Sequence, residues 1–242
     1  MLKGLAKAIL KQTPYRVVRD YGVNRFQGID VCLVNLRNRG FTPDLIIDGG
    51  AHLGDFSRLA AKVFSNARCE LVEPQEACLP HLRKLARARG WGLHAVAFGA
   101  DEGQTVNFSR TDAPNTGVHV VQAAGPDTIQ AAVATLDGLF FSPERTLGRV
   151  LLKMDLQGYE LEALRGGQKL LPDIEVILTE VSFFAQDREP SIFELMSFLN
   201  ERGFDLYDIA ALWGRWRDNR ACQGDFIFVR RGTELLADTS WE

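Results

Sequence analysis

The sequence lacks the cysteine and histidine patterns that mark metal sites. Its four cysteines contain no C-x-x-C pair, and its four histidines show no close ligand spacing. These residues are Cys32, Cys69, Cys78 and Cys222, and His52, His81, His94 and His119. Because structural zinc sites need such spacing, no structural zinc site is predicted.

Long apolar runs and a strong charge of one sign are also missing. No stretch approaches the ~18 apolar residues of a membrane span, and lysines interrupt the apolar positions at the N-terminus, so neither a transmembrane helix nor a signal peptide is predicted. A formal net charge of −3 provides no global basic field for nucleic acid. We therefore expect a cytoplasmic protein with reduced thiols, without nucleic-acid binding or stable membrane insertion.

Residues 1–40 depart from this average because they are basic. Eight lysines and arginines stand there against Asp20 and Asp30. Leu2, Leu5 and Ile9 follow helical spacing, with lysines on a neighbouring stripe, which predicts an amphipathic helix. We expect this segment to pack on the core with a solvated basic face, although a membrane surface or an acidic substrate is an alternative partner.

Residues 41–242 are expected to form one α/β domain, because apolar strands alternate with helices. Core strands are predicted at 45–48, 69–73, 93–98, 149–155 and 174–181, and helices at 29–39, 55–64, 75–89, 158–171 and 191–202. Further strands are predicted at 105–109, 205–210 and 225–230, with a mobile loop at 110–127. Strands that are apolar on both faces and separated by helices favour a mostly parallel sheet covered on both sides, and the last strand could pair antiparallel.

A glycine-rich turn follows the first core strand. The run L-I-I-D-G-G-A-H-L-G-D-F-S places Gly49 and Gly50 where the backbone must turn sharply. Glu73 ends the next strand, 25 positions after Asp48, where a carboxylate can accept hydrogen bonds from a ribose. Asp48 would repel a pyrophosphate, and Ala51 replaces a glycine of G-x-G-x-x-G. Both features favour S-adenosylmethionine over a nicotinamide cofactor.

A second dense segment, L-L-K-M-D-L-Q-G-Y-E-L-E-A-L-R-G-G, follows a later strand. Lys153 and Asp155 share one face of that strand. Asp155 could hold the methionyl amine, orient a substrate hydroxyl or bind a divalent metal with Glu180, and Lys153 could neutralise an anionic substrate. Lys153 and Asp155 could instead simply pair with each other. Asp48, Glu73, Asp155 and Glu180 all end strands, and this concentration of carboxylates at one rim implies ligands that are cationic or donate hydrogen bonds.

These blocks, in this order and together with L-V-E-P, A-V-A-F-G, T-L-D-G-L and I-L-T-E-V, resemble the FkbM family of S-adenosylmethionine-dependent methyltransferases over residues 41–231. The resemblance implies the class I methyltransferase fold, a Rossmann-like seven-stranded sheet with an antiparallel last strand. It also implies methylation of hydroxyl groups on sugars, polyketides or other small metabolites.

The resemblance assigns residues to the cofactor site. The first cofactor loop contains Asp48, Gly49, Gly50, Ala51, His52, Gly54, Asp55, Phe56 and Ser57. Glu73 becomes the ribose carboxylate, Pro74 lies beside the adenosine, Val96 and Ala97 line the adenine, and Asp155 lies near cofactor and substrate. Two residues depart from the family pattern: His52 stands where asparagine is common, and Gln157 replaces a frequent glutamate, which removes one candidate base or metal ligand.

The expected reaction is O-methylation of a small-molecule acceptor. Asp155 or Glu180 would accept or orient the hydroxyl proton, Lys153 would supply positive potential, and His119 is a reserve base. A nicotinamide-dependent reductase is an alternative, but no tyrosine is followed four positions later by lysine. A non-catalytic nucleoside-binding module of the same fold is another. Trp213, Trp216 and the nearby arginines could stack on a sugar or simply pack on the surface. A homodimer is possible.

Overall fold

A computed structural model describes residues 28–109, 113–114, 120–121, 124–144, 146–184 and 190–240. The amphipathic helix predicted near the N-terminus lies outside these residues, as do His119 and most of the loop predicted at 110–127. The division into a segment of 40 residues and a domain of 41–242 stays a prediction. In the described part of the chain, no helix combines the length and apolar character that crossing a bilayer requires.

The centre of the fold is a seven-stranded sheet in the order β10-β11-β9-β8-β1-β2-β3. Its strands are β1 (Leu45–Gly49), β2 (Arg68–Val72), β3 (Gly92–His94), β8 (Val150–Met154), β9 (Ile174–Ser182), β10 (Phe204–Gly214) and β11 (Ala221–Arg230). All neighbours from β9 to β3 pair in parallel, and β11 runs antiparallel to both β9 and β10. The predicted fold, mostly parallel with a reversed last strand, is confirmed.

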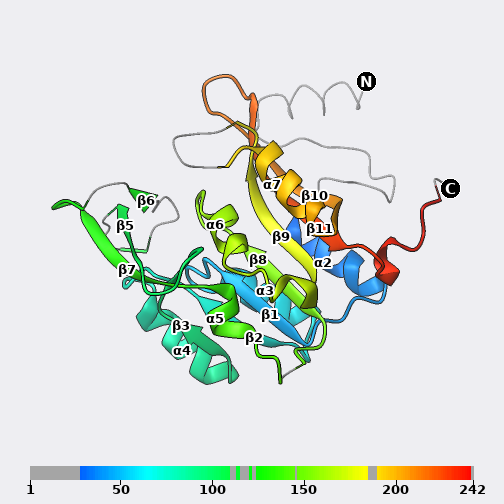
Figure 1. Cartoon of the computed structure of the whole chain (residues 1–242), viewed down its shortest axis with the longest axis horizontal. Coiled ribbons are helices and arrows are strands. Elements are labelled where there is room, and N and C mark those ends of the chain that lie inside the picture. Colours follow the sequence, from blue (N-terminus) through cyan, green and yellow to red (C-terminus); the bar gives the residue numbers. More distant parts are fainter. Residues whose placement is uncertain are drawn as a thin grey trace, which may run out of the picture.

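Helices cover both faces of this sheet (Figure 1). The first face carries α2 (Ile29–Asn38), α3 (Asp55–Val63) and α4 (Leu79–Arg89), and the second carries α5 (Leu136–Phe140), α6 (Glu160–Arg165) and α7 (Ile192–Glu201). Successive strand residues separate the two cores: Ile46 packs in the cluster of α2 and α3, whereas Ile47 packs in the cluster of α5, α6 and α7. Two short 3₁₀ helices, η1 (Leu171–Asp173) and η2 (Glu234–Leu236), complete the fold.

A second, four-stranded sheet lies beside the first, with β5, β6 and β7 at the left of Figure 1. It contains β4 (Ala97–Phe98), β5 (Thr105–Ser109), β6 (Val120–Val121) and β7 (Thr128–Ala134), in the order β4-β7-β5-β6. The single strand predicted at 93–98 is therefore wrong. His94 pairs with Val72 in the central sheet, but Ala97 pairs with Val133 in the second sheet, so the chain changes sheets between them.

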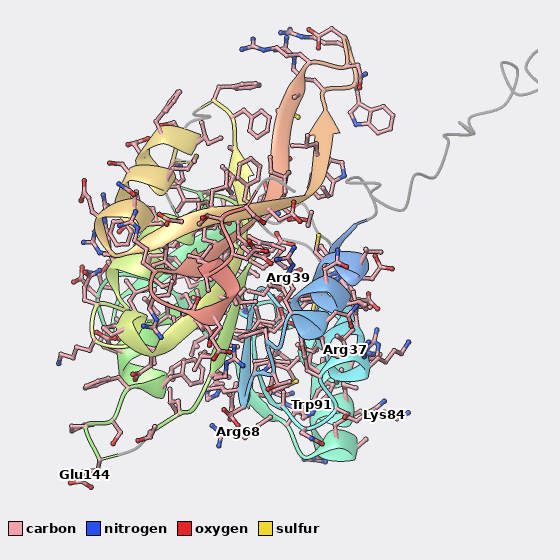
Figure 2. All side chains as sticks on the ribbon, turned by 90° about the vertical axis from the view of Figure 1, so that its right-hand side faces the viewer. Arg37, Arg39, Arg68, Lys84, Trp91 and Glu144 are labelled. Carbon is pink, nitrogen blue, oxygen red and sulfur yellow. The ribbon has the colours of Figure 1, made fainter. Side chains whose placement is uncertain are left out.

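The last two strands form an antiparallel pair, and β11 is inserted between β9 and β10. Both strands are longer than predicted, and Figure 2 shows their outer half extending beyond the body of the molecule. The helix predicted at 158–171 is shorter: α6 ends at Arg165, before Gly166 and Gly167. Because a Cβ on Gly166 would lie 2.1 Å from the Gly99 carbonyl oxygen, this glycine allows the close approach of two backbones.

Candidate active site

The turn between β1 and α3 is held between the ends of its two neighbouring strands. The N–H groups of Gly50 and Ala51 both donate to the Val72 carbonyl of β2, at 3.0 and 3.1 Å. On the other side, a Cβ on Gly50 would lie 2.0 Å from the Asp155 carbonyl oxygen, and Gly50 has a φ of 71°. Only glycine fits this conformation and this space together, so the turn needs Gly50 for a physical reason.

Asp48 lies beneath the turn and is fully buried. Its Oδ2 accepts a hydrogen bond of 2.6 Å from the Ser57 hydroxyl at the start of α3. Its Oδ1 lies 3.2 Å from Lys153 Nζ, which is an ion-pair distance, although the orientation does not suit a hydrogen bond. Because a buried carboxylate needs a compensating partner, Asp48 ties the turn to α3 and to β8.

Lys153 projects from β8 into the base of the same turn. Its Nζ donates to the carbonyls of Gly49 and Gly50, at 3.1 and 2.9 Å, and lies 3.9 Å from Asp155 Oδ2. Burial by itself would lower the pKa of Lys153, but the charges of Asp48 and Asp155 outweigh it and hold the pKa above its ordinary value. The ammonium is therefore charged and bonded to the turn after β1, and its predicted contact with a substrate stays a prediction.

Glu73 follows β2 and is also buried. Its two oxygens accept hydrogen bonds from the backbone N–H groups of His52 (2.6 Å) and Gln75 (2.9 Å), which fix the carboxylate at the end of the strand. Burial raises the pKa of Glu73 above its ordinary value, although the two N–H groups act in the opposite direction. Since an ionised carboxylate offers about four lone-pair sites, two remain for hydroxyl donors.

Glu73 opens into a cleft that encloses about 640 Å³, including the space at its mouth. This lies within the range of small-molecule and cofactor sites, roughly 300–1,000 Å³. Seven of the predicted site residues line the cleft: Gly50, His52, Glu73, Pro74, Val96, Ala97 and Asp155. The cleft also contains residues that the sequence did not indicate, namely Val72, Gln75, Phe98, Phe108, Leu156 and Tyr159.

The other predicted cofactor residues support the turn or lie beyond it. Asp48, Ala51 and Ser57 are buried, and Gly54 begins α3 with its Cβ position 2.5 Å from Leu85 Cδ2. Asp55 is exposed and pairs with Arg58. Phe56 lines a different pocket, described below. The direct contacts of these residues with a cofactor remain predictions.

His52 carries an unusual feature for a residue in this cleft. It has a φ of 48°, and among the described residues its buried Nε2 has no hydrogen-bond partner. A buried ring nitrogen without a partner costs free energy, on the order of 1–3 kcal/mol. This atom therefore indicates that a polar ligand completes the site.

A second pocket lies on the α2 and α3 side of the strand ends and shares Asp155 and Gln157 with the cleft. Its lining residues are Ile29, Phe56, Lys153, Met154, Asp155, Gln157, Leu178, Glu180, Trp213, Gln223 and Asp225. Gln157 Nε2 lies 2.9 Å from Asp155 Oδ1 and 3.4 Å from Glu180 Oε2, so its amide connects the two predicted catalytic carboxylates. Asp225 lines the same pocket and was not among the residues predicted from the sequence.

The aromatic and basic cluster predicted near Trp213 is divided by the hairpin. Trp213 lines the second pocket, whereas Trp216 is completely exposed. Arg215 is paired with Asp218 at 2.5 Å, and its guanidinium and that of Arg220 lie over the Phe184 ring. Of these residues, Trp213 is the one in position to contact a ligand of the second pocket.

Glu160 begins α6 and supports the segment after β8. One carboxylate oxygen accepts hydrogen bonds from the N–H groups of Leu156 (2.7 Å) and Gly158 (3.4 Å). The side chain is almost fully buried, and burial raises the pKa of Glu160 to about 7. Glu160 therefore titrates in the physiological range because of its environment.

We expect Glu160→Gln to remove a pH dependence of stability. In the folded protein the pKa of Glu160 lies above its ordinary value of 4.5, so protonated Glu160 stabilises the fold fully below pH 4.5, and this stabilisation is lost as pH rises through 7. The difference between the two pKa values corresponds to about 3 kcal/mol of unfolding free energy. Urea unfolding of both proteins at pH 5 and pH 8 should show that the free energy of unfolding of the variant, relative to that of the wild type, is higher at pH 8 than at pH 5. An unfolding free-energy difference that is the same at both values would contradict this assignment.

The fold and the site together define a class of protein. The strand order reverses between β1 and β8, and the glycine turn, Glu73 and Asp155 all lie at the carboxyl ends of the strands around that point, where open α/β sheets bind ligands. With β11 inserted antiparallel between β9 and β10, this is the Rossmann-like arrangement of class I methyltransferases.

Comparison with known proteins narrows the class to a family. Residues 48–206, more than half of the 242-residue chain, match the family model of the methyltransferase FkbM domain. The chain therefore belongs to the FkbM methyltransferase family. The resemblance inferred from its sequence blocks is confirmed. None of the curated proteins matches the chain in sequence.

Several solved structures are similar in fold. Methyltransferase FkbM from Methylobacillus flagellatus KT is 17% identical, with a TM-score of 0.49, over 85% of this chain and 45% of its own. Precorrin-6y C5,15-methyltransferase from Geobacter metallireducens GS-15 is 15% identical, with a TM-score of 0.44, over 84% and 87%. An S-adenosylmethionine-dependent methyltransferase from Clostridium acetobutylicum ATCC 824 is 8% identical, with a TM-score of 0.47, over 95% and 98%. The chain thus spans less than half of the first of these proteins.

Proposed function

We propose that this methyltransferase binds S-adenosylmethionine in the cleft beside Glu73 and methylates a hydroxyl group of a small-molecule acceptor. The observation that carries this proposal is the buried Glu73 carboxylate, which two backbone N–H groups fix in the wall of a cleft of suitable volume. The unpartnered Nε2 of His52 supports it, because a polar ligand would supply the missing hydrogen bond. When bound, the cofactor supplies an electrophilic methyl group on a sulfonium centre.

The residues of the cleft suit the parts of this cofactor. Glu73 can accept hydrogen bonds from the ribose hydroxyls through its free lone pairs. Val96, Ala97 and Phe98 provide an apolar wall for the adenine. Asp155 is about half exposed and lies where the cleft meets the second pocket, so its carboxylate can reach a group on either side.

Glu73→Gln should lower the affinity for S-adenosylmethionine by about 10- to 100-fold, because charge-assisted hydrogen bonds become neutral ones. Isothermal titration calorimetry measures the effect, with exposed Glu76→Gln as the matched control. Because the pKa of Glu73 is raised, binding by the wild type should also weaken as pH falls, beginning above the ordinary range of a carboxyl group. Equal affinities of the two variants would assign the ribose to another residue.

Asp155 is the proposed acceptor of the hydroxyl proton. Asp155→Asn should therefore lower kcat by about 10²-fold while cofactor affinity stays within a factor of about two. The amide of Gln157 already orients Asp155 Oδ1, so an asparagine oxygen can keep the same place. Parallel measurements on Glu180→Gln compare the second candidate. A loss of cofactor affinity equal to the loss of turnover would instead make Asp155 the partner of the methionyl amine.

Methyl transfer itself is tested with labelled cofactor and a metabolite extract of the host. We expect the label to appear in a small molecule as an ether that resists mild acid and base. Label on carbon or nitrogen would contradict O-methylation, and absence of cofactor binding in calorimetry would contradict the enzymatic proposal. Binding with no labelled product in any extract would favour a non-catalytic module of the same fold.

A further inference from the structure

The second pocket contains the partly buried carboxylate of Asp225, for which the described residues provide no paired cation. Asp225 on β11 lies directly opposite Glu180 on β9, and directly opposed side chains of neighbouring strands lie about 5 Å apart at Cβ. Among the described residues, no hydrogen bond or ion pair reaches the carboxylate of Asp225. An arrangement of this kind is unfavourable until a ligand compensates it.

Lys153, the one lysine among the described residues that line the pocket, does not provide that compensation. Lys153 directs its Nζ toward the carbonyls of Gly49 and Gly50 and toward Asp48, whose negative charge balances the positive charge of the lysine. Asp155 lies further from this ammonium, at 3.9 Å, and receives its hydrogen bond from the neutral amide of Gln157. The charge of Asp225 therefore adds to that of Asp155 at the junction of the two pockets.

Apart from the amides of Gln157 and Gln223, the remaining lining of the second pocket is apolar or aromatic. Phe56 and Trp213 face it together with Leu178 and Ile29. Aromatic faces attract cations, most strongly when the cation is removed from water, and the aliphatic part of a ligand packs on the other side chains. Trp213 on β10 is the register partner of Gln223 on β11. Both residues line the pocket together with Asp225.

We propose that the second pocket binds the methyl acceptor through a positively charged group, such as a protonated amine, which pairs with Asp225 and contacts Trp213. This inference rests on the proposed function and narrows its acceptor to hydroxyl compounds that also carry a cation. An organic cation suits the site better than a metal ion, because in the described part of the chain no three His, Cys, Asp or Glu side chains are arranged to hold a metal. Asp225 is then a residue that determines acceptor specificity.

The protonation behaviour of Asp225 agrees with this geometry. Burial, and then the charge of Asp155, raise the pKa of Asp225 to about 6. A cation bound between the two carboxylates would favour their ionised forms and lower that pKa again.

The first test sorts the labelled products of methyl transfer by charge at pH 7. We expect the label from a metabolite extract to be retained on a cation exchanger. Asp225→Asn should lower the labelling about tenfold or more, as expected for loss of a hydrogen-bonded charge, without changing cofactor affinity. Asp173→Asn is the matched control, since Asp173 is exposed and precedes the opposite end of β9. A neutral or anionic product would overturn the proposal.

The second test needs neither cofactor nor acceptor, so it separates this inference from the proposed function. Cationic and anionic nitroxides of similar size are added to the isotope-labelled protein, and the broadening of the amide resonances of Gln157, Gln223 and Gly224 is compared. The cationic probe should broaden these resonances at least about threefold more than the anionic probe does. Asp225→Asn should reduce this ratio of broadening, and Asp173→Asn should leave it unchanged. Equal broadening by the two probes would overturn the proposal even if methyl transfer is observed.

Discussion

Lys153→Met should destabilise the protein by about 3–5 kcal/mol, because it leaves Asp48 buried without a compensating charge. The carbonyls of Gly49 and Gly50 would lose their donor at the same time. A loss of this size is a large part of the total stability of a typical domain, about 5–15 kcal/mol. Urea denaturation monitored by tryptophan fluorescence measures it.

A double-mutant cycle with Asp48→Asn shows whether the loss arises from the ion pair. Removing both charges should be less harmful than the sum of the two single changes, with a coupling of about 2 kcal/mol or more between the sites. If Lys153 served only to neutralise an anionic substrate, the Lys153→Met variant would have the same urea midpoint of unfolding as the wild type, and only its KM for the acceptor would change. The contacts of Nζ with the cofactor loop lead us to expect the first outcome.

The central sheet could be predicted because its strands are short apolar segments between clear helix signals. Residues 45–48, 69–73, 149–155 and 174–181 all correspond to strands, with ends that differ by at most one position. Strand β7 was missed. Its inward positions are Ile129, Ala131 and Val133, and an alanine in the middle of such a pattern gives a weak strand signal. The α5 helix was missed as well, although Thr135 caps it by accepting a hydrogen bond from the Gly138 N–H.

The cleft proposed to bind the cofactor could be located for a similar reason. Glycine turns and carboxylates at the ends of parallel strands meet at one edge of the sheet, so their positions in the sequence indicated Glu73 and Asp155, which line the cleft, and Asp48, which lies beneath the turn. That rule fails for Asp225. Because β11 runs antiparallel to β9, Asp225 lies opposite Glu180 in the middle of β11 and not at its carboxyl end, and the sequence does not show between which strands β11 is inserted.

The role of Lys153 also depends on information that the sequence does not contain. Alternation places Lys153 and Asp155 on one face of β8, which made an ion pair between them the simplest alternative to a catalytic role. In the structure Nζ lies closer to Asp48, at 3.2 Å, than to Asp155, at 3.9 Å. The direction of a long side chain is decided by buried partners on the neighbouring strand, so it follows from tertiary packing.

Gly50→Ala should abolish measurable binding of S-adenosylmethionine. The new Cβ would lie 2.0 Å from the Asp155 carbonyl oxygen, and backbone on both sides restricts any adjustment: Gly50 donates to Val72, and Asp155 donates to Gly49 at 3.2 Å. The turn must therefore move by about an ångström or more. Displacements of that size in a site can cost on the order of 10²-fold, and here the moving segment is the floor of the cleft that Glu73 and Asp155 flank.

Gly90→Ala is the matched control for this variant. Gly90 ends α4 with a φ of 68°, close to the 71° of Gly50, but nothing lies within 4 Å of its Cβ position. Both variants bear the strain of a left-handed alanine, about 1 kcal/mol, and only Gly50→Ala adds the steric conflict. Calorimetry should show wild-type affinity for Gly90→Ala and none for Gly50→Ala. Comparable affinities in the two variants would mean that the turn can open without harming the cleft, and that β8 does not position the cofactor loop.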